Sequence, residues 1–384
     1  MTEKSENTSR RDLLKWTGAA GIAGLAGCAG NGNGGNGTTT TKQTTTGGGG
    51  EQENVRGAWL YISQTGDRGW SWAHDQGRKW CDQHYDWLDT AYSEAVPPAD
   101  AKAVLQQYAN QDYDIIFGTT FAYMQPMYTV AQNHPNTLFE HATGYKTRQN
   151  MGRYMGRIYQ DRYLTGIAAG MLTDSDLLGY VAAFPLPEVV RGINAFALGA
   201  QSVNKDAEVL VRWINAWYDP TKTRQAAQAL IDQGVDVMAQ HMDSPAAVKT
   251  ANENNIWSIG YDSPMAKFGG EKYITSPFWN WEAFYAPTLI SVKQDTWKSD
   301  FFWGDIGYTF NGMNNERSIH LFELDDWGPQ VPQNVKDKVA NARSALRNDE
   351  MSVWGGSKFE GKSERFLFRE MSSFVPSVRG KVPE

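Results

Sequence analysis

Residues 177–204 contain the sequence pattern that most constrains the fold. A short apolar run at 180–184 has the length of a buried strand, and apolar residues then recur at helical spacing. The helical positions are Val189, Ile193, Phe196 and Ala200. This order of strand, turn and helix places the turn at the carboxyl end of a strand, which is where open α/β sheets bind their ligands.

The same unit recurs along most of the chain. Strand-like runs lie at 56–62, 113–117, 137–141, 180–184, 208–214, 235–239 and 256–260. Helical patterns lie at 70–84, 99–110, 123–133, 151–172, 187–202, 221–233 and 245–254. Strands that alternate with helices predict parallel sheets with helices on both faces, so we expect an α/β fold.

The pattern further predicts two similar lobes. The helical pattern at 151–172 separates two sets of units, which gives a first lobe at 55–173 and a second lobe at 174–280. Weaker patterns follow, with helices at 281–292 and 332–348 and a strand at 318–324. We interpret 281–384 as return segments that complete both lobes. Several crossovers of this kind resemble the type I periplasmic-binding-protein architecture, in which two lobes close on a ligand about a hinge.

The composition argues against a nucleic-acid partner. The chain of 384 residues has a formal net charge of −7 and lacks the clusters of Lys and Arg that phosphate binding requires. Aromatic residues make up 12% of the chain and include 15 tryptophans, which is more than a core of this size normally needs. Surplus tryptophans often line sites that stack planar rings or sugars.

Residues 1–28 have the pattern of an export signal. Arg10 and Arg11 resemble a twin-arginine signal, and the apolar run at 16–27 that follows is too short to span a membrane. The sequence LAGC ending at Cys28 resembles a lipobox, so we expect Cys28 to carry a lipid that anchors the protein to the outer face of the cell membrane. Residues 29–54 are rich in Gly, Thr and Asn and predict a flexible tether. A disordered terminus with a chance cysteine is the alternative.

Three segments of the body resemble the basic membrane protein family. They read RYLTGIAAGML, LLGYVAAFPLPEVVRGINAFALGAQSVN and ALIDQGVDVMAQHMDSPAAVKTANENNIWSIGYDS. The resemblance covers roughly 55–291, and its most specific parts are GVD at 234–236 and GYDS at 260–263. Members of this family are solute-binding lipoproteins of ABC importers that bind purine nucleosides or related heteroaromatic compounds. The resemblance therefore implies a ligand of that class and an ABC permease as partner.

Two positions depart from the pattern of the family. Where relatives carry a phenyl ring after the first strand, this chain has Trp70, so the stacking ring would be an indole. Three residues after Ser276, where relatives often carry a lysine, this chain has Trp279. Without that lysine, a bare nucleobase or another flat ring fits the expectation as well as a nucleoside does.

Three aromatic residues follow predicted strands and are candidates for stacking on the ligand. Trp70 begins a helix after the first strand, and a core residue that covers the helix is the alternative. Phe121 ends the polar loop GTTF, which ordinary turn chemistry also explains. Phe184 lies in the turn of the unit at 177–204, and we expect it to contact the ligand.

Three polar residues have the same position after predicted strands. His241 and Asp243 follow the strand at 235–239, and Asp262 follows the strand at 256–260. An ionised Asp only accepts hydrogen bonds, so it suits a ring that presents N–H donors. Asp243 could instead cap the helix that Pro245 begins, and Asp262 could serve the turn alone.

The sequence gives little support for catalysis, a cofactor or a metal. It has no GKS/T phosphate loop, no GxSxG elbow and no HExxH pair. His74, Cys81 and His84 could share one side of a helix, but a buried free cysteine is ordinary in a core. With Cys28 lipidated, Cys81 has no partner for a disulfide.

The sequence therefore predicts a monomeric, lipid-anchored extracytoplasmic receptor rather than an enzyme. It binds a purine nucleobase, a nucleoside or a similar flat heteroaromatic solute between two lobes and delivers it to an ABC permease. A sugar-binding receptor of the same fold and an extracytoplasmic enzyme that acts on nucleosides are the alternatives.

Overall fold

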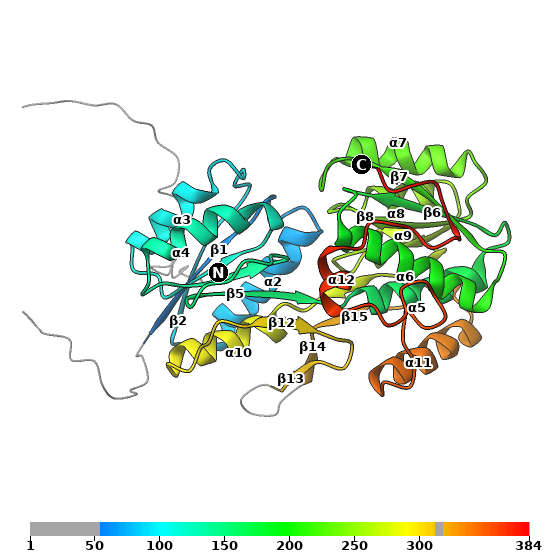
Figure 1. Cartoon of the computed structure of the whole chain (residues 1–384). Coiled ribbons are helices and arrows are strands. Elements are labelled where there is room, and N and C mark those ends of the chain that lie inside the picture. The colour runs from blue at the N-terminus through cyan, green and yellow to red at the C-terminus, as the bar shows by residue number, and fades with distance from the viewer. Residues whose placement is uncertain (1–53, 312–317, 384) are drawn as a thin grey trace, which may run out of the picture. The chain divides into compact units, whose positions relative to one another are not determined.

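Two parallel sheets organise the part of the chain that the structure describes, a computed structural model of residues 54–311 and 318–383 (Figure 1). The first sheet has six strands in the order β12-β5-β4-β3-β1-β2, and every neighbouring pair is parallel. Its strands are β1 (Val55–Leu60), β2 (Leu88–Ser93), β3 (Ile115–Gly118), β4 (Leu138–Ala142), β5 (Met151–Gly156) and β12 (Phe301–Gly304).

The second sheet is built in the same way, with the order β10-β9-β8-β6-β7-β16 and parallel pairing throughout. Its strands are β6 (Leu177–Ala182), β7 (Glu208–Trp213), β8 (Val237–His241), β9 (Trp257–Ile259), β10 (Tyr273–Thr275) and β16 (Val378–Arg379). Because helices flank both sheets, the predicted α/β class with two lobes is confirmed.

Helices cover both faces of each sheet because strand side chains alternate between the faces. On β1, Trp59 packs with α2 (Trp70–His84) and α10 (Glu282–Lys293), whereas Leu60 packs with α3 (Ala101–Asn110) and α4 (Met124–Asn133).

On β6 of the second sheet, Tyr180 and Val181 face opposite layers in the same manner. The layer of Tyr180 holds α5 (Tyr159–Leu172) and α6 (Pro187–Val203). The layer of Val181 holds α7 (Pro220–Ile231) and α8 (Ala246–Glu253), and the short α9 (Ala266–Gly269) packs on α8.

The helix predicted over 151–172 is wrong in its first part. Residues Met151–Gly156 form strand β5, next to the edge strand β12, and the helix α5 begins only at Tyr159. Gly152 leaves room for Glu140 on the neighbouring strand, because a Cβ there would lie 2.7 Å from the Glu140 Oε1 atom. Helix α5 packs closely on α6 of the second lobe, while the lobe boundaries at 173 and 280 stay predictions.

The chain passes between the two sheets three times. The first passage joins β5 to α5, and the other two use β11 (Pro277–Trp279) and β15 (Phe322–Leu324), which pair antiparallel. Between the latter two passages the chain completes the first sheet with β12 and forms a hairpin of β13 (Thr309–Asn311) and β14 (Ser318–His320).

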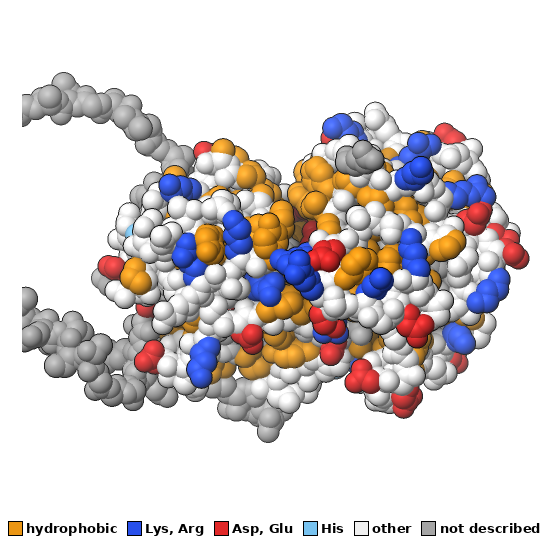
Figure 2. All heavy atoms as spheres, viewed as in Figure 1, with side chains coloured by type: hydrophobic (Ala, Val, Ile, Leu, Met, Phe, Trp, Pro, Cys, Tyr) orange, Lys and Arg blue, Asp and Glu red, His pale blue; other side chains and the backbone are white. Residues whose placement is uncertain are grey.

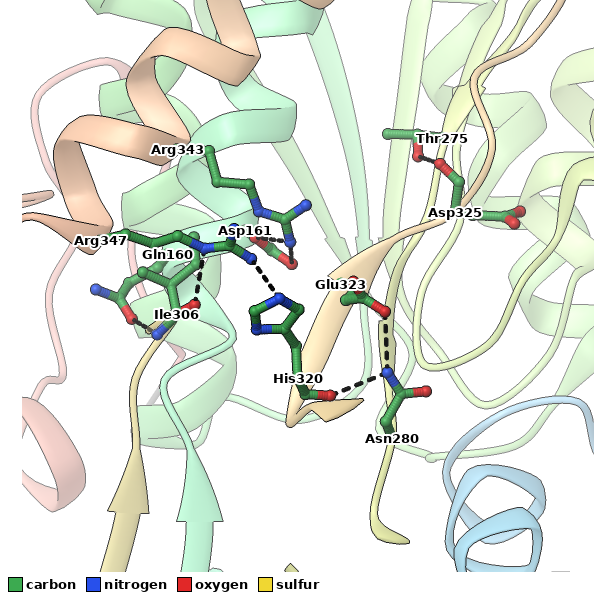
Figure 3. Close-up of polar contacts among 10 residues, drawn as sticks. All are labelled: Gln160, Asp161, Thr275, Asn280, Ile306, His320, Glu323, Asp325, Arg343 and Arg347. Atoms are coloured by element: carbon green, nitrogen blue, oxygen red, sulfur yellow. Dashed lines mark hydrogen bonds and ion pairs between the residues drawn. The ribbon is translucent and has the colours of Figure 1, made fainter. Parts of the chain in front are cut away.

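Side-chain hydrogen bonds hold the passages together (Figure 3). Asn280 donates to the His320 carbonyl oxygen at 3.0 Å and to Glu323 at 3.2 Å, and these bonds join the two antiparallel segments. Helix α11 (Gln333–Arg347) is joined to the first passage, because Arg343 contacts the buried carboxylate of Asp161 at 3.2 Å. These bonds join the second and third passages to each other and α11 to the first passage, and we call the three passages the hinge.

The last described helix, α12 (Glu364–Arg369), contacts both lobes (Figure 1). The Phe368 ring lies 4.8 Å from Phe301 and 5.2 Å from Trp303 on β12 of the first sheet. On the side of the second lobe, Arg191 of α6 donates to the carbonyl oxygens of Leu367 and Phe368 at 2.6 and 3.0 Å. The segment thus links the lobes at a second place beside the hinge.

The predicted signal, the lipidated Cys28 and the tether up to residue 53 lie outside the described residues. Among the residues that are described, no helix has the length and apolarity that a membrane span would require.

A buried acid in the first lobe generates a stability prediction. Glu140 on β4 is 5% exposed, and its Oε1 atom accepts a bond from Trp297 at 2.9 Å. Burial raises the pKa of Glu140 from 4.5 to about 8. The unfolded chain therefore loses this proton near pH 4.5, whereas the folded chain keeps it to about pH 8, so the contribution of Glu140 to stability falls across this interval.

We expect Glu140→Gln to remove that part of the pH dependence, because the amide oxygen still accepts from Trp297 and carries no charge. In thermal unfolding, the melting temperature of the variant relative to that of the wild type should increase as the pH rises from about 5 to about 8. An equal difference in melting temperature at both pH values would contradict this assignment.

Candidate functional site

A cavity lies between the lobes, at the carboxyl ends of strands from both sheets. The surface is hollowed there (Figure 2), and the cavity holds about 390 Å³ of space, part of it open to solvent. Its lining residues are Ile62, Trp70, Thr119, Thr120, Phe121, Thr143, Met155, Glu188, Trp217, His241, Asp243, Tyr261 and Asp262.

Aromatic rings from both lobes line this cavity. Trp70 and Phe121 belong to the first lobe, and Trp217 and Tyr261 belong to the second. Trp70 is held firmly, because its Nε1 atom donates to the Thr119 carbonyl oxygen at 2.5 Å and its ring meets three other rings edge to face. A fixed indole at the cavity surface is suited to stack on a planar or apolar ligand face.

Asp243 and Asp262 form the acidic side of the cavity and are only 2% and 1% exposed. Asp262 Oδ1 accepts from Trp279 Nε1 at 3.0 Å, whereas both Oδ2 atoms have no hydrogen-bond partner in the described part of the chain. Burial raises the pKa of both carboxyl groups well above the usual value, and the charge of Asp262 adds to the effect on Asp243. A ligand with N–H or O–H donors would supply the missing bonds.

The loop before α2 brings a third acid to this side. Asp67 Oδ1 accepts from the backbone N–H groups of Gly69 at 2.8 Å and Trp72 at 3.1 Å, which fixes the start of the helix. Its Oδ2 atom is buried and has no partner within 54–311 and 318–383. Burial raises the pKa of Asp67 to about 6.

His241 and Glu188 lie on the side of the second lobe. Burial, together with the nearby charges of Arg162 and Arg191, lowers the pKa of His241 well below its usual value, so the imidazole is neutral near pH 7. A neutral imidazole both donates and accepts hydrogen bonds. Burial raises the pKa of Glu188 to about 7, with Arg191 acting in the opposite direction.

The lobes touch each other at the rim of the cavity. Ser263 of the second lobe donates to the Arg68 carbonyl oxygen of the first lobe at 2.5 Å. Next to this bond, a Cβ on Gly69 would lie 2.3 Å from the Asp243 Cα atom, so only glycine allows this approach. The structure therefore shows the lobes closed over the cavity.

The structure brings five of the seven predicted binding residues together at this cavity: Trp70, Phe121, His241, Asp243 and Asp262. The alternative role of Asp243 as a helix cap does not occur, because α8 begins after Pro245 without a side-chain cap. Asp262 adopts a left-handed backbone conformation with φ of 64°. It therefore forms part of the turn and also lines the cavity.

Phe184 and Trp279 are not among the residues that line the cavity. The Phe184 ring packs against Trp217 at 5.1 Å, and Trp217 is the residue that reaches the cavity. Trp279 is 2% exposed, stacks on Trp281 at 4.5 Å and donates to Asp262. Both side chains therefore support residues of the lining.

Sequence reasoning missed Trp217, Tyr261 and Glu188 as lining residues. Trp217 follows β7, so the rule that found the other candidates could have found it. Tyr261 precedes Asp262 in the GYDS turn and directly follows the predicted strand at 256–260, so the same rule applies to it.

No group of three or more His, Cys, Asp or Glu side chains suited to a metal occurs in the described ranges. His74 and Cys81 lie on the buried face of α2, whereas His84 is exposed at the end of this helix. The arrangement around the cavity instead offers ring faces and hydrogen-bond acceptors, which suit binding of a small polar ring.

The fold is that of ABC transporter solute-binding proteins. Such a protein from Aeropyrum pernix K1 aligns with a TM-score of 0.66 at 16% identity, covering 78% of this chain and 92% of that chain. One from Conexibacter woesei DSM 14684 aligns with a TM-score of 0.63 at 21% identity, covering 78% and 98%. Two parallel-sheet lobes around a cavity thus define a periplasmic-binding-protein-like fold.

Within this class the chain belongs to the Bmp family, the PnrA-like ABC transporter substrate-binding proteins, whose model matches residues 54–326. The chain is 54% identical, over the whole of both chains, to a Haloferax volcanii protein named as an ABC transporter glucose-binding protein, TsgA13. It is 42% identical to a protein of Brucella abortus named as a purine-binding protein, over 87% of this chain and 95% of that protein.

Membership in this family defines the general role of the protein. It is an ABC transporter substrate-binding protein, which binds a small solute outside the cytoplasm and works with a membrane permease. The resemblance to the basic membrane protein family is confirmed.

Replacing Trp70 tests the aromatic wall. We expect Trp70→Ala to weaken binding of a purine probe such as adenine by about 1–3 kcal/mol, because the stacking surface is lost. Trp72→Ala is the matched control, since Trp72 lies on the same helix and is not part of the lining. Isothermal titration calorimetry measures both variants, and equal affinities for Trp70→Ala and Trp72→Ala would contradict the role of Trp70.

Proposed function

We propose that this protein is a lipid-anchored receptor that binds a purine nucleobase or nucleoside, or a similar flat heteroaromatic solute, between its lobes. It delivers the solute to an ABC permease. The observation that carries the proposal is the pairing of rings with carboxyl oxygens in one closed cavity, above all Trp70 with the unpaired Oδ2 atoms of Asp243 and Asp262.

A purine matches both halves of this cavity. Its flat faces suit indole and phenyl surfaces, and its ring or exocyclic N–H groups can donate to the unpaired carboxyl oxygens of Asp243 and Asp262. The relative named as a purine-binding protein supports the same solute class.

Solute binding and lobe closure are coupled in this proposal. In the open form, water solvates the carboxyl groups of Asp243 and Asp262. Closure removes that water, and a solute that donates to both groups offsets the cost of their burial. A solute without these donors leaves buried acceptors unpaired, so the closed form rejects it. Only the closed form then docks productively on the permease.

A sugar is the second candidate solute, because the relative with 54% identity is named as a glucose-binding protein. Sugar hydroxyls also donate to carboxyl groups, and the apolar faces of sugars stack on tryptophan. The two candidates differ in the aromatic contact, since only a purine presents two flat π faces.

Calorimetry with a solute panel separates these candidates. After removal of any copurified solute by unfolding and refolding, we expect micromolar or tighter binding of adenine, hypoxanthine or adenosine, and no measurable binding of D-glucose or D-ribose. Tight binding of a sugar without purine binding would contradict the proposed solute class.

The lipid anchor is a separate proposal with its own test. We expect Cys28→Ser to move the protein from the membrane fraction into the soluble fraction, because the lipid-bearing thiol is absent. Cys81→Ala is the matched control, since the Cys81 side chain is buried in the core and cannot carry a lipid. Fractionation followed by immunoblotting gives the readout, and a Cys28→Ser protein that stays with the membrane would contradict anchoring at this residue.

A further inference from the structure

A second chamber adjoins the cavity on the side of the hinge. It is narrow and is lined by Met155, Ile158, Tyr159, Arg162, Glu188, Arg191, Gly192, His241 and Tyr261. The two spaces are direct neighbours, because both are lined by Met155, Glu188, His241 and Tyr261.

Arg162 is a buried cation in this chamber. It lies in the first turns of α5 and is 1% exposed, and its guanidinium group lies 3.6 Å from the Tyr261 ring centroid. The Nε, Nη1 and Nη2 atoms have no hydrogen-bond acceptor among the residues that the structure describes. A buried guanidinium that gives up water without gaining acceptors is strongly unfavourable, so the chamber is incomplete without an acceptor.

The other arginine of the chamber does not share this need. Arg191 donates through Nη1 to the carbonyl oxygens of Leu367 and Phe368 on α12. Arg162, in contrast, forms no ion pair with the nearby Asp262, although the two groups interact through their charges. An acceptor group located between them and belonging to the solute would satisfy the guanidinium.

The position of Arg162 is fixed by its neighbours. The preceding residue, Asp161, is bonded to Arg343 of α11 at 3.2 Å, which holds the start of α5 (Figure 3). The ring of Tyr261 lies against the flat face of the guanidinium, so its N–H groups point along its edges. A planar fork of this kind recognises two neighbouring acceptor atoms, as arginine does with O6 and N7 of guanine.

We infer that Arg162 determines which purine is bound, by donating to the carbonyl oxygen and neighbouring ring nitrogen of a 6-oxopurine such as hypoxanthine or guanine. This inference rests on the proposed function and makes it more specific. Asp243 and Asp262 accept hydrogen bonds from N–H groups on the remaining edges of the ring. Adenine places an amino donor where the oxygen would be, so that donor faces the N–H groups of Arg162.

A strongly anionic solute fits less well. Asp67, Asp243 and Asp262 all lie close enough to influence one another's charge, and Arg162 is the one cation of the cavity and chamber without a hydrogen-bond acceptor among the described residues. The balance therefore favours a neutral ring with both donors and acceptors over a phosphate ester.

The experiment compares hypoxanthine with adenine in calorimetry on the wild type, Arg162→Gln and Arg162→Lys. The wild type should bind hypoxanthine about 10- to 100-fold more tightly than adenine, as expected for bidentate recognition by arginine. Arg162→Gln should lose most of this preference, and Arg162→Lys should retain only part of it, because an ammonium group cannot form the planar fork. Arg224→Gln is the matched control, since Arg224 lies at the surface of the same lobe in an ion pair with Glu253.

The outcomes distinguish this inference from the proposed function. Equal affinity of the wild type for hypoxanthine and adenine, or a preference that survives in Arg162→Gln, overturns the inference and leaves purine binding intact. Absence of all purine binding in the wild type overturns the proposed function as well. If Arg162→Gln fails to fold, the comparison between the wild type and Arg162→Lys decides the matter, and an unchanged preference in Arg162→Lys overturns the inference.

Discussion

Ionisable side chains that are buried between two lobes with hydrogen-bonding atoms left unpaired are the constraint on which this structure depends. Asp243 and Asp262 each bury an unpaired carboxyl oxygen, and Arg162 buries a whole guanidinium group without an acceptor, counting only described residues. Such groups are stable when water or a matching solute pairs with them. Burying them without either costs free energy. The closed arrangement is therefore favourable when a bound solute supplies the missing hydrogen bonds. Closure of the lobes thus indicates that solute is bound.

The fold supplies this arrangement through two parallel sheets whose carboxyl ends border one cavity. Each wall consists of short turns after strands, so side chains of different chemistry can be placed without altering the sheets. The hinge and α12 lie beside the cavity, and Arg191 connects α12 to the chamber wall. The family match ends at residue 326, whereas α11, α12 and β16 all follow it, so the contacts of α12 with both lobes come from the segment beyond that match.

Much of the fold and part of the site could be predicted from the sequence. Repeated strands and helices indicated the parallel sheets, and the rule that ligands bind after strands identified residues such as Trp70 and Asp262. Strand β5 was missed because its residues directly precede α5, and the two segments were interpreted as one glycine-containing helix. Arg162 was missed because helical spacing does not reveal that a charged residue is buried without a partner. Trp279 was predicted to contact the ligand but lies behind the cavity lining, because the sequence does not show how deeply a side chain is buried.

The coupling between solute and closure can be measured most directly by small-angle X-ray scattering. The protein is refolded free of copurified solute, and its radius of gyration is compared before and after saturation with hypoxanthine. The radius should be larger without solute, because Asp243, Asp262 and Arg162 are then solvated in an open form, and it should decrease when solute is added. Identical scattering in both states, at solute concentrations where calorimetry shows saturation, would contradict it.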